Sequence, residues 1–227
     1  MPNIRIIIIF AVIVIAAIGG LAWPFLANMK LGYILEPAQA SQWHMGKGSE
    51  YTPDMVYQVS FNQTKFSADM KFLPVSGGNQ QLLIKIDPSN DTKEIDQTVN
   101  IGLVYDFVDT SAESKPYVDL LDQSIFSMRD YATESKYLSK DAEWGDIYIG
   151  ENEETLKVTD SGKMPFKFGS ANAFLLSYRI GVDINKVWIV DNLPLPVKSE
   201  IYDPYGNLLY TYELVSLKAP STPGFTS

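Results

Sequence analysis

Residues that could carry out chemistry are scarce in this sequence. His44 is the single histidine among the 227 residues, and there is no cysteine. A Ser-His-acid triad would have to use His44, but the chain lacks the Gly-x-Ser-x-Gly turn that presents the nucleophilic serine in one large class of hydrolases. His44 and Met45 could supply two copper ligands, but neither a His-rich nor a Met-x-x-Met cluster accompanies them. We therefore predict no catalytic, cofactor-binding or metal-ligating residue, and a packing or hydrogen-bonding role for His44.

Acidic residues gather in two places. The larger group surrounds a predicted turn and comprises Glu143, Asp146, Glu151, Glu153 and Glu154. Two carboxyl groups facing each other across roughly 5–9 Å could hydrolyse a glycoside, although a solvated acidic loop is the more common reason for such a cluster. The second group, Asp87-Pro88-Ser89-Asn90-Asp91, alternates oxygen atoms as a calcium loop does, but lacks the glycine and the distal bidentate glutamate. We interpret it as a turn, and keep loose calcium binding and a carboxylate-pair hydrolase as minority alternatives.

Composition and charge exclude further classes. The chain is 46% hydrophobic and 20% charged, which is typical of a folded domain rather than a disordered one. Its formal net charge of -9 would repel a nucleic acid. Neither a P-loop nor a dinucleotide-binding glycine motif follows a predicted strand, so nucleotide chemistry is not predicted. Disulfide scaffolds and thiolate zinc sites are excluded because there is no cysteine.

An apolar segment near the start of the chain predicts a membrane helix. Residues 6–26 form 21 consecutive positions without a charged side chain. At 1.5 Å per residue this length matches a hydrocarbon core of roughly 30 Å. Arg5 and the α-amino group favour a cytoplasmic N-terminus over residues 1–5, although Lys30 and Lys47 on the far side weaken that bias. We expect a single-pass protein that contacts the lipid bilayer through residues 6–26 and exposes the rest outside the cytoplasm.

Cleavage of this helix is a separate question. Ala38-Gln39-Ala40 has the small-x-small form of a signal peptidase site, but it lies about a dozen residues beyond the apolar stretch, farther than usual. We therefore favour a retained anchor, a spacer over residues 27–50, an extracytoplasmic domain over residues 51–218 and a flexible tail over residues 219–227. Asn62 and Asn90 begin Asn-x-Thr sequons, which fit polar turns at least as well as glycosylation sites.

Beyond the spacer, side chains mostly alternate between apolar and polar. This period of two predicts strands at 56–61, 65–72, 81–86, 99–105, 146–149, 154–158, 173–180, 186–190, 197–202 and 208–215. Short turn-rich joints between them indicate antiparallel neighbours. The best turn signal is Asp203-Pro204-Tyr205-Gly206-Asn207, which has proline and glycine where a hairpin needs them.

One helix is predicted between the strands, from about Pro116 to Tyr137. Its apolar residues recur at spacings of three and four: Val118, Leu121, Ile125, Met128 and Ala132. We expect this stripe to cover one face of the sheet. The predicted fold is therefore mainly β, a curved antiparallel sheet or half-barrel with one covering helix, plus the N-terminal transmembrane helix.

Two segments carry a resemblance to a known group. They are Trp43-His44-Met45-Gly46-Lys47-Gly48 and the run from Trp188 to Lys198, which contains Asp191, Pro194 and Pro196. They resemble membrane-anchored exported proteins of ammonia-oxidising archaea, which share a Trp-His-(Ile/Met)-Gly-Lys-Gly start and a Trp-Val-Val-Asp…Pro-x-Pro-(Val/Ile)-Lys hairpin. The resemblance covers the two ends of the domain and implies an archaeal, exported protein. The family-like motif residues are Trp43, His44, Gly46, Lys47, Gly48, Trp188, Asp191, Pro194, Pro196 and Lys198.

More distantly, the end of the chain is similar to that of periplasmic lipoprotein carriers. The similarity lies in the Pro-x-Lys turn and the Asp-x-x-Gly-x-Leu hairpin of residues 203–208. Those carriers wrap a half-barrel over a helix and hold acyl chains in an apolar cavity. The similarity implies the fold, which by itself does not determine function.

These observations predict a non-enzymatic binding or assembly module at the cell envelope. An apolar ligand or a partner segment would lie on the sheet, with Phe174, Leu176, Tyr178 and Trp188 as possible ligand-facing residues, although such aromatic residues more often fill a core. The alternative is an accessory single-span subunit of a membrane complex, since Gly19-Gly20 would permit close helix approach. No cofactor is predicted.

Overall fold

The computed structural model describes residues 41–89, 94–101, 105–149 and 152–218. The chain divides into two compact units, residues 1–40 and residues 41–227. The predicted membrane helix, the cytoplasmic residues 1–5, Ala40, Asn90 and the tail all lie outside the described residues. Within the described ranges, no helix is both long and apolar enough to cross a membrane.

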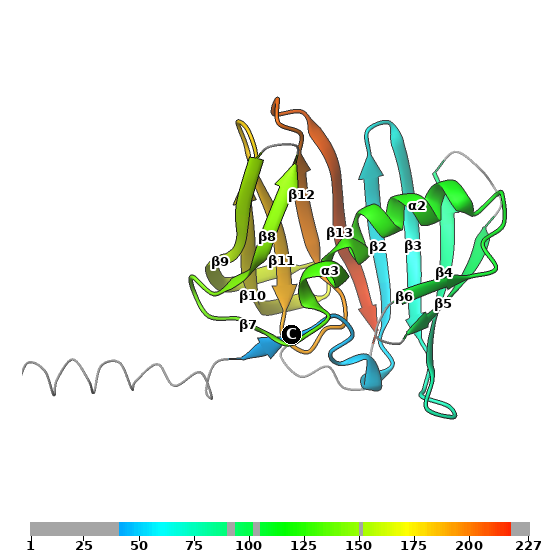
Figure 1. The fold of residues 1–227 in the computed structure, drawn as a ribbon. Coiled ribbons are helices and arrows are strands. Elements are labelled where there is room, and N and C mark those ends of the chain that lie inside the picture. Colours follow the sequence, from blue (N-terminus) through cyan, green and yellow to red (C-terminus); the bar gives the residue numbers. More distant parts are fainter. Residues whose placement is uncertain (1–40, 90–93, 102–104, 150–151, 219–227) are drawn as a thin grey trace, which may run out of the picture. The chain divides into compact units, whose positions relative to one another are not determined.

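The described domain is built on one large antiparallel sheet (Figure 1). Its eleven strands follow the order β6-β5-β4-β3-β2-β13-β12-β11-β10-β9-β8, and the sheet does not close into a barrel. In chain order the strands are β2 (Asp54–Phe61), β3 (Thr64–Phe72), β4 (Gln80–Pro88), β5 (Ile95–Ile101), β6 (Tyr105–Val108), β8 (Glu143–Ile149), β9 (Asn152–Phe166), β10 (Gly169–Arg179), β11 (Ile184–Val190), β12 (Lys198–Tyr202) and β13 (Leu208–Lys218). The mainly β, antiparallel prediction is confirmed.

The tightest hairpins follow the sequence rules. Asn62 takes a positive φ of 51° in the two-residue turn that joins β2 to β3. In the turn between β12 and β13, one Asp203 carboxylate oxygen accepts the backbone N–H groups of Tyr205 and Asn207, at 2.8 and 2.9 Å. Gly206 supplies the positive φ of 88° that this turn needs. These turns fix the register of the strands that line the candidate site.

Two strand predictions are corrected. The predicted strand 99–105 belongs to two strands, since β5 ends at Ile101 and β6 begins at Tyr105. Strand β9 runs eight residues past the predicted end at 158, to Phe166. A β-bulge opposite Leu175 and Leu176 lets β9 continue with a changed register.

The single predicted helix, from about Pro116 to Tyr137, is also wrong in extent. The structure has α2 (Lys115–Gln123), a 3-10 turn η3 (Ile125–Met128) and α3 (Arg129–Ala132), followed by the short strand β7 (Lys136–Tyr137). The break falls at Ser124, whose φ and ψ of -111° and -92° are not helical. Its hydroxyl donates a 2.6 Å hydrogen bond to the Leu120 carbonyl, which competes with the helical ladder.

The predicted apolar stripe is nevertheless buried. Leu121, Ile125 and Ala132 have no exposed surface, and Val118 and Met128 have very little. Aromatic contacts tie the helical segment to the sheet, through Phe66 with Tyr117 and Tyr105 with Phe126. Figure 1 shows α2 lying across β2 to β5. The prediction that this stripe covers one face of the sheet is confirmed.

Part of the predicted spacer belongs to the domain. Strand β1 (Gln42–Trp43) pairs with β7, and the 3-10 turn η2 (Ser49–Tyr51) leads into β2. Trp43 is completely buried and its ring stacks on Trp144 with centroids 5.8 Å apart. Residues 42–50 of the expected spacer are therefore folded with the domain, because this segment buries a large aromatic side chain in the core.

Candidate functional site

The two faces of the sheet differ in character. On β2, Met55, Tyr57 and Val59 are buried against the helical segment, while Gln58 and Ser60 point to the other side. The first side will be called the helix face and the second the open face. The helix face is filled by core side chains, among which Phe126, Leu121 and Ile125 have no exposed surface.

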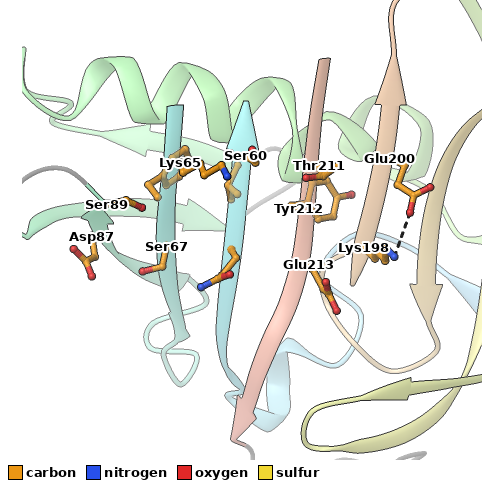
Figure 2. Close-up of a pocket in the computed structure, with 13 residues that line it drawn as sticks. Ser60, Lys65, Ser67, Asp87, Ser89, Lys198, Glu200, Thr211, Tyr212 and Glu213 are labelled. Carbon is orange, nitrogen blue, oxygen red and sulfur yellow. Dashed lines mark ion pairs between the residues drawn. The ribbon is translucent and has the colours of Figure 1, made fainter. Parts of the chain in front are cut away.

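A groove of about 500 Å³ lies on the open face, across β4, β3, β2, β13 and β12 (Figure 2). Its polar lining residues are Gln58, Ser60, Lys65, Ser67, Asp87, Ser89, Lys198, Glu200, Thr211 and Glu213. Val59, Phe66 and Tyr212 complete the lining, although their side chains belong to the core. The groove is therefore lined mainly by polar side chains and lies directly over the apolar core.

Strand register explains how these side chains meet. One row across the strands runs Asp87, Ser67, Gln58, Glu213, Lys198, Trp188, Leu175, Asp160. A neighbouring row runs Lys65, Ser60, Thr211, Glu200, Lys186. In the second row the short side chains of Ser60 and Thr211 lie between the longer ones of Lys65 and Glu200, and in the first row Ser67 is short. The hollow follows from this difference in length, and it crosses the strands rather than running along them.

Charges in the groove are only partly neutralised. The Lys198 ammonium lies 3.2 Å from one carboxylate oxygen of Glu200, and Lys186 lies 3.6 Å from the other. Lys198 also sits over the Trp188 ring, 5.1 Å from its centroid. Within the described part of the chain, Asp87, Glu213 and Lys65 form no ion pair. Two free carboxylates and one free ammonium group thus remain for a ligand.

The predicted ligand-facing residues do not share one surface. Leu176 pairs with Val187 and Trp188 with Leu175, so Phe174, Leu176 and Tyr178 lie on the helix face and Trp188 on the open face. Leu176 is completely buried. Burial also raises the pKa of Tyr178 above its ordinary value, with a smaller contribution from Tyr210. Of the four residues, only Trp188 lies beside the groove.

The family-like motif residues, by contrast, come together. The Trp43 indole N–H donates a 2.7 Å hydrogen bond to the Leu193 carbonyl, and the Gly46 amide donates one of 2.8 Å to the Pro194 carbonyl. The Lys47 ammonium binds the Asp191 carboxylate. Residues 43–48 are thus fastened to the loop 191–197, and the two segments will be called the joint.

Other motif residues complete the joint. Gly48 has a φ of 85°, and a Cβ there would lie 2.2 Å from the Asn192 carbonyl oxygen, so only glycine fits. The Pro196 carbonyl accepts a 2.9 Å hydrogen bond from the buried Tyr57 hydroxyl. These contacts hold backbone in place and expose no reactive group. Within the joint the geometry of the motif is that of a structural element, whereas the motif residues Trp188 and Lys198 lie outside it, beside the groove.

Within the described ranges, the residues considered for chemistry are not gathered into a reactive site. The Ser135 hydroxyl lies 3.3 Å from Nδ1 of His44, in an exposed position. Asp146 accepts a hydrogen bond from Thr155, and Glu153 one from Tyr148, on the exposed hairpin of β8 and β9. Glu143 and Glu154 lie on the same two strands, and Glu151 is outside the described residues.

The metal alternatives gain no geometric support. Among the residues that the structure describes, no group of three or more His, Asp or Glu side chains is placed to hold a metal ion. Asp87 and Pro88 end β4, and Asn90 and Asp91 of the predicted turn lie outside the described ranges.

The groove residues were missed in the sequence. Ser60, Ser67, Thr211 and Glu213 occupy polar positions of three predicted strand segments, where they are indistinguishable from ordinary solvent-facing residues. A usable signal would have been the run of short polar side chains on strands that also carry free charges. Placing them side by side still requires the strand order, which brings β13 next to β2.

Comparisons with known proteins assign no family. No protein-family model and no curated protein matches the chain. The crystal structure of MucB is similar over 76% of this chain and 54% of that chain, with 11% identity and a TM-score of 0.43. The MucA/MucB complex of Pseudomonas aeruginosa matches with 12% identity, 78% and 54% coverage and a TM-score of 0.40. A proposed lipoprotein from Parabacteroides distasonis matches with 11% identity, 79% and 100% coverage and a TM-score of 0.34. The chain spans about half the length of the MucB chains, and at these TM-scores the similarity carries no functional argument.

Proposed function

We propose that this chain is a membrane-anchored, extracytoplasmic binding module without catalytic activity, and that its groove holds an extended, basic polypeptide segment of a partner protein. The observation that carries the proposal is the polar groove of about 500 Å³ with its free carboxylates, Asp87 and Glu213. Anchoring by residues 6–26 and the archaeal, exported family are part of the same proposal and rest on the sequence pattern alone.

The size and lining of the groove favour an extended segment. From β4 to β12 there are four steps between neighbouring strands, or about 19 Å at 4.8 Å per step. An extended chain of about six residues covers that length. Serine, threonine and glutamine side chains along the floor can donate to and accept from a peptide backbone. An apolar ligand would leave these groups without partners.

Charge favours a basic segment. With Lys198 paired to Glu200, the groove has Asp87 and Glu213 against Lys65, an excess of one negative charge. Residues 41–227 carry 16 basic and 26 acidic side chains, a net charge of -10, which attracts cationic partners over a longer range. Ion pairs between basic residues of the bound segment and the carboxylates of Glu213 and Asp87 would fix the position of the segment along the groove.

Selection of peptides tests the proposal. The full chain, held in phosphatidylcholine nanodiscs, is screened against randomised peptides of about ten residues, somewhat longer than the groove. Selected sequences should be enriched in lysine and arginine. Glu213→Lys should weaken the selected peptides about tenfold, because it replaces an attraction with a repulsion. Asp106→Lys, the same charge change at an exposed position of β6 away from the groove, should leave affinity unchanged.

Failure of the selection would have a clear meaning. If no peptide is enriched, or if Glu213→Lys and Asp106→Lys weaken binding equally, the groove does not hold a basic segment. Native size analysis after detergent extraction would then decide for the accessory subunit if the chain migrates with larger membrane partners.

Topology has its own test. In oriented membranes, protease added on the outer side should remove nearly everything after Ala27. Digestion from the inner side only would overturn the proposed location.

A further inference from the structure

We infer that the groove continues into an apolar subsite on β9, β10 and β11, and that this subsite receives an aliphatic or aromatic side chain of the same partner segment. The inference deepens the proposed function and rests on it. It adds a specific requirement, namely that the partner segment carries an apolar anchor at a fixed distance from a cationic residue.

A second hollow, of about 240 Å³, supplies the subsite. Trp188, Leu175 and Met164 are its large apolar lining residues, and each is partly buried. Gly162 and Ala173 are paired across β9 and β10 in its lining. A Cβ placed on Gly162 would meet no heavy atom within 4 Å. Because Gly162 has no side chain, it leaves this space open between its larger neighbours.

Register places this hollow next to the groove. Trp188 pairs with Lys198, and Leu175 with Trp188, so the subsite lies on the same row as Glu213 and on the same face of the sheet. Lys198, held over the Trp188 ring, marks the boundary between the polar and the apolar part. A segment lying in the groove across the strands would reach the subsite without turning.

The spacing follows from the number of strands. From Glu213 on β13 to Leu175 on β10 there are three steps, or about 14 Å. An extended peptide covers this distance in about four residues. The partner segment should therefore carry a lysine or arginine and, about four residues away, a leucine or phenylalanine.

The volume favours a side chain over a whole lipid. Sites for independent small ligands usually enclose about 300–1,000 Å³. A hollow of about 240 Å³ is below that range and has a polar rim that includes Asp160 and Lys163. One apolar side chain presented by a polar backbone fits this combination, whereas an acyl chain would extend over the rim.

Gly162 offers a variant that fills the hollow without disturbing the fold. Its φ lies outside the left-handed region, so a side chain causes no backbone strain there. Gly162→Leu should therefore occupy the subsite while thermal unfolding stays unchanged or improves slightly. The matched control is Asn172→Leu, which adds a leucine to the same hairpin at an exposed position facing away from Ala173.

The experiment measures fluorescence anisotropy with the full chain in nanodiscs and labelled serine-rich peptides. One peptide has lysine and phenylalanine four residues apart, a second has alanine for the phenylalanine, and a third has lysine and phenylalanine adjacent; each is made in both orders. The first should bind about tenfold more tightly than the other two, because only it buries the ring. Gly162→Leu should remove this advantage, and Asn172→Leu should keep it.

Each other outcome decides against the inference in a distinguishable way. If the peptides bind with equal affinity and Glu213→Lys still weakens them, the apolar subsite is wrong and the basic groove stands. If no peptide binds, both proposals fall. If instead a fluorescent fatty acid binds saturably and Gly162→Leu abolishes this, the hollow takes lipid and not a partner side chain.

Discussion

Replacing Trp43 tests whether the joint is part of the folded core. Trp43 has no exposed surface, stacks on Trp144 and donates a 2.7 Å hydrogen bond to the Leu193 carbonyl. Trp43→Ala should lower the free energy of unfolding by about 3–5 kcal/mol, as for other buried tryptophans. Trp43→Phe keeps most of the ring but loses the N–H donor, which should cost about 1–3 kcal/mol.

The assay is urea unfolding of the full chain in nanodiscs, followed by the circular dichroism of the β-sheet. Neighbouring His44 provides the control, because it is only partly buried and its contact with Ser135 is exposed. His44→Ala should change the unfolding free energy by less than about 0.5 kcal/mol. If the unfolding free energy falls with urea concentration at the same slope in each variant, the differences between variants reflect stability alone.

A small effect would refute the reasoning. If Trp43→Ala costs under about 1 kcal/mol, or no more than His44→Ala, residues 41–51 do not belong to the core. The family-like motif would then need a different explanation, such as direct contact with a partner.

Three further predictions follow from burial and backbone geometry. Gly48→Ala should cost over about 3 kcal/mol, because the new Cβ meets the Asn192 carbonyl oxygen, whereas Gly78→Ala, at a similar φ of 83° in open space, should cost about 1 kcal/mol; equal losses in urea unfolding would contradict the clash. Met128→Ala should cost about 2–4 kcal/mol in the same assay, and a loss under about 0.5 kcal/mol would place the residue outside the core. Burial raises the pKa of Tyr210 to about 12, so the folded state keeps a proton that the unfolded state loses near pH 10; stability should be intact below about pH 10 and decline as the pH rises toward 12, and a melting temperature constant across that window would contradict this assignment.

Local chemistry made most of the sheet predictable. Strand positions followed from alternation, and hairpins from residues such as Asn62 and Gly206, whose backbone conformations the turns require. The helical segment was predicted too long because its apolar spacing continues past Ser124. Periodicity reports which side chains are buried, and it does not detect a break that keeps the same side chains facing the core.

The faces of the strands were harder to predict than the strands themselves. Leu176 and Trp188 are both apolar residues near the middle of neighbouring strands, and a register shifted by one residue would put them on the same face. The observed pairing of Leu175 with Trp188 separates them. That pairing depends on the loop between β10 and β11, which alternation within either strand cannot determine. The groove was missed for the same reason, because its side chains come together only once the registers of the four pairings from β4 to β12 are known.

The joint and the groove are linked through one short segment. Loop 191–197 is held by Trp43, Gly46 and Lys47 on one side, and its last residue, Val197, donates its amide to the Trp188 carbonyl at 2.8 Å. The next residue is Lys198, which begins β12 and borders both the groove and the apolar subsite. A change in the joint should therefore act on the groove through the position of β12, without touching a ligand. The two segments of the joint, residues 43–48 and 191–197, would then change together in sequence because they support the same strand. The residues that select the partner would lie outside the joint, on the open face.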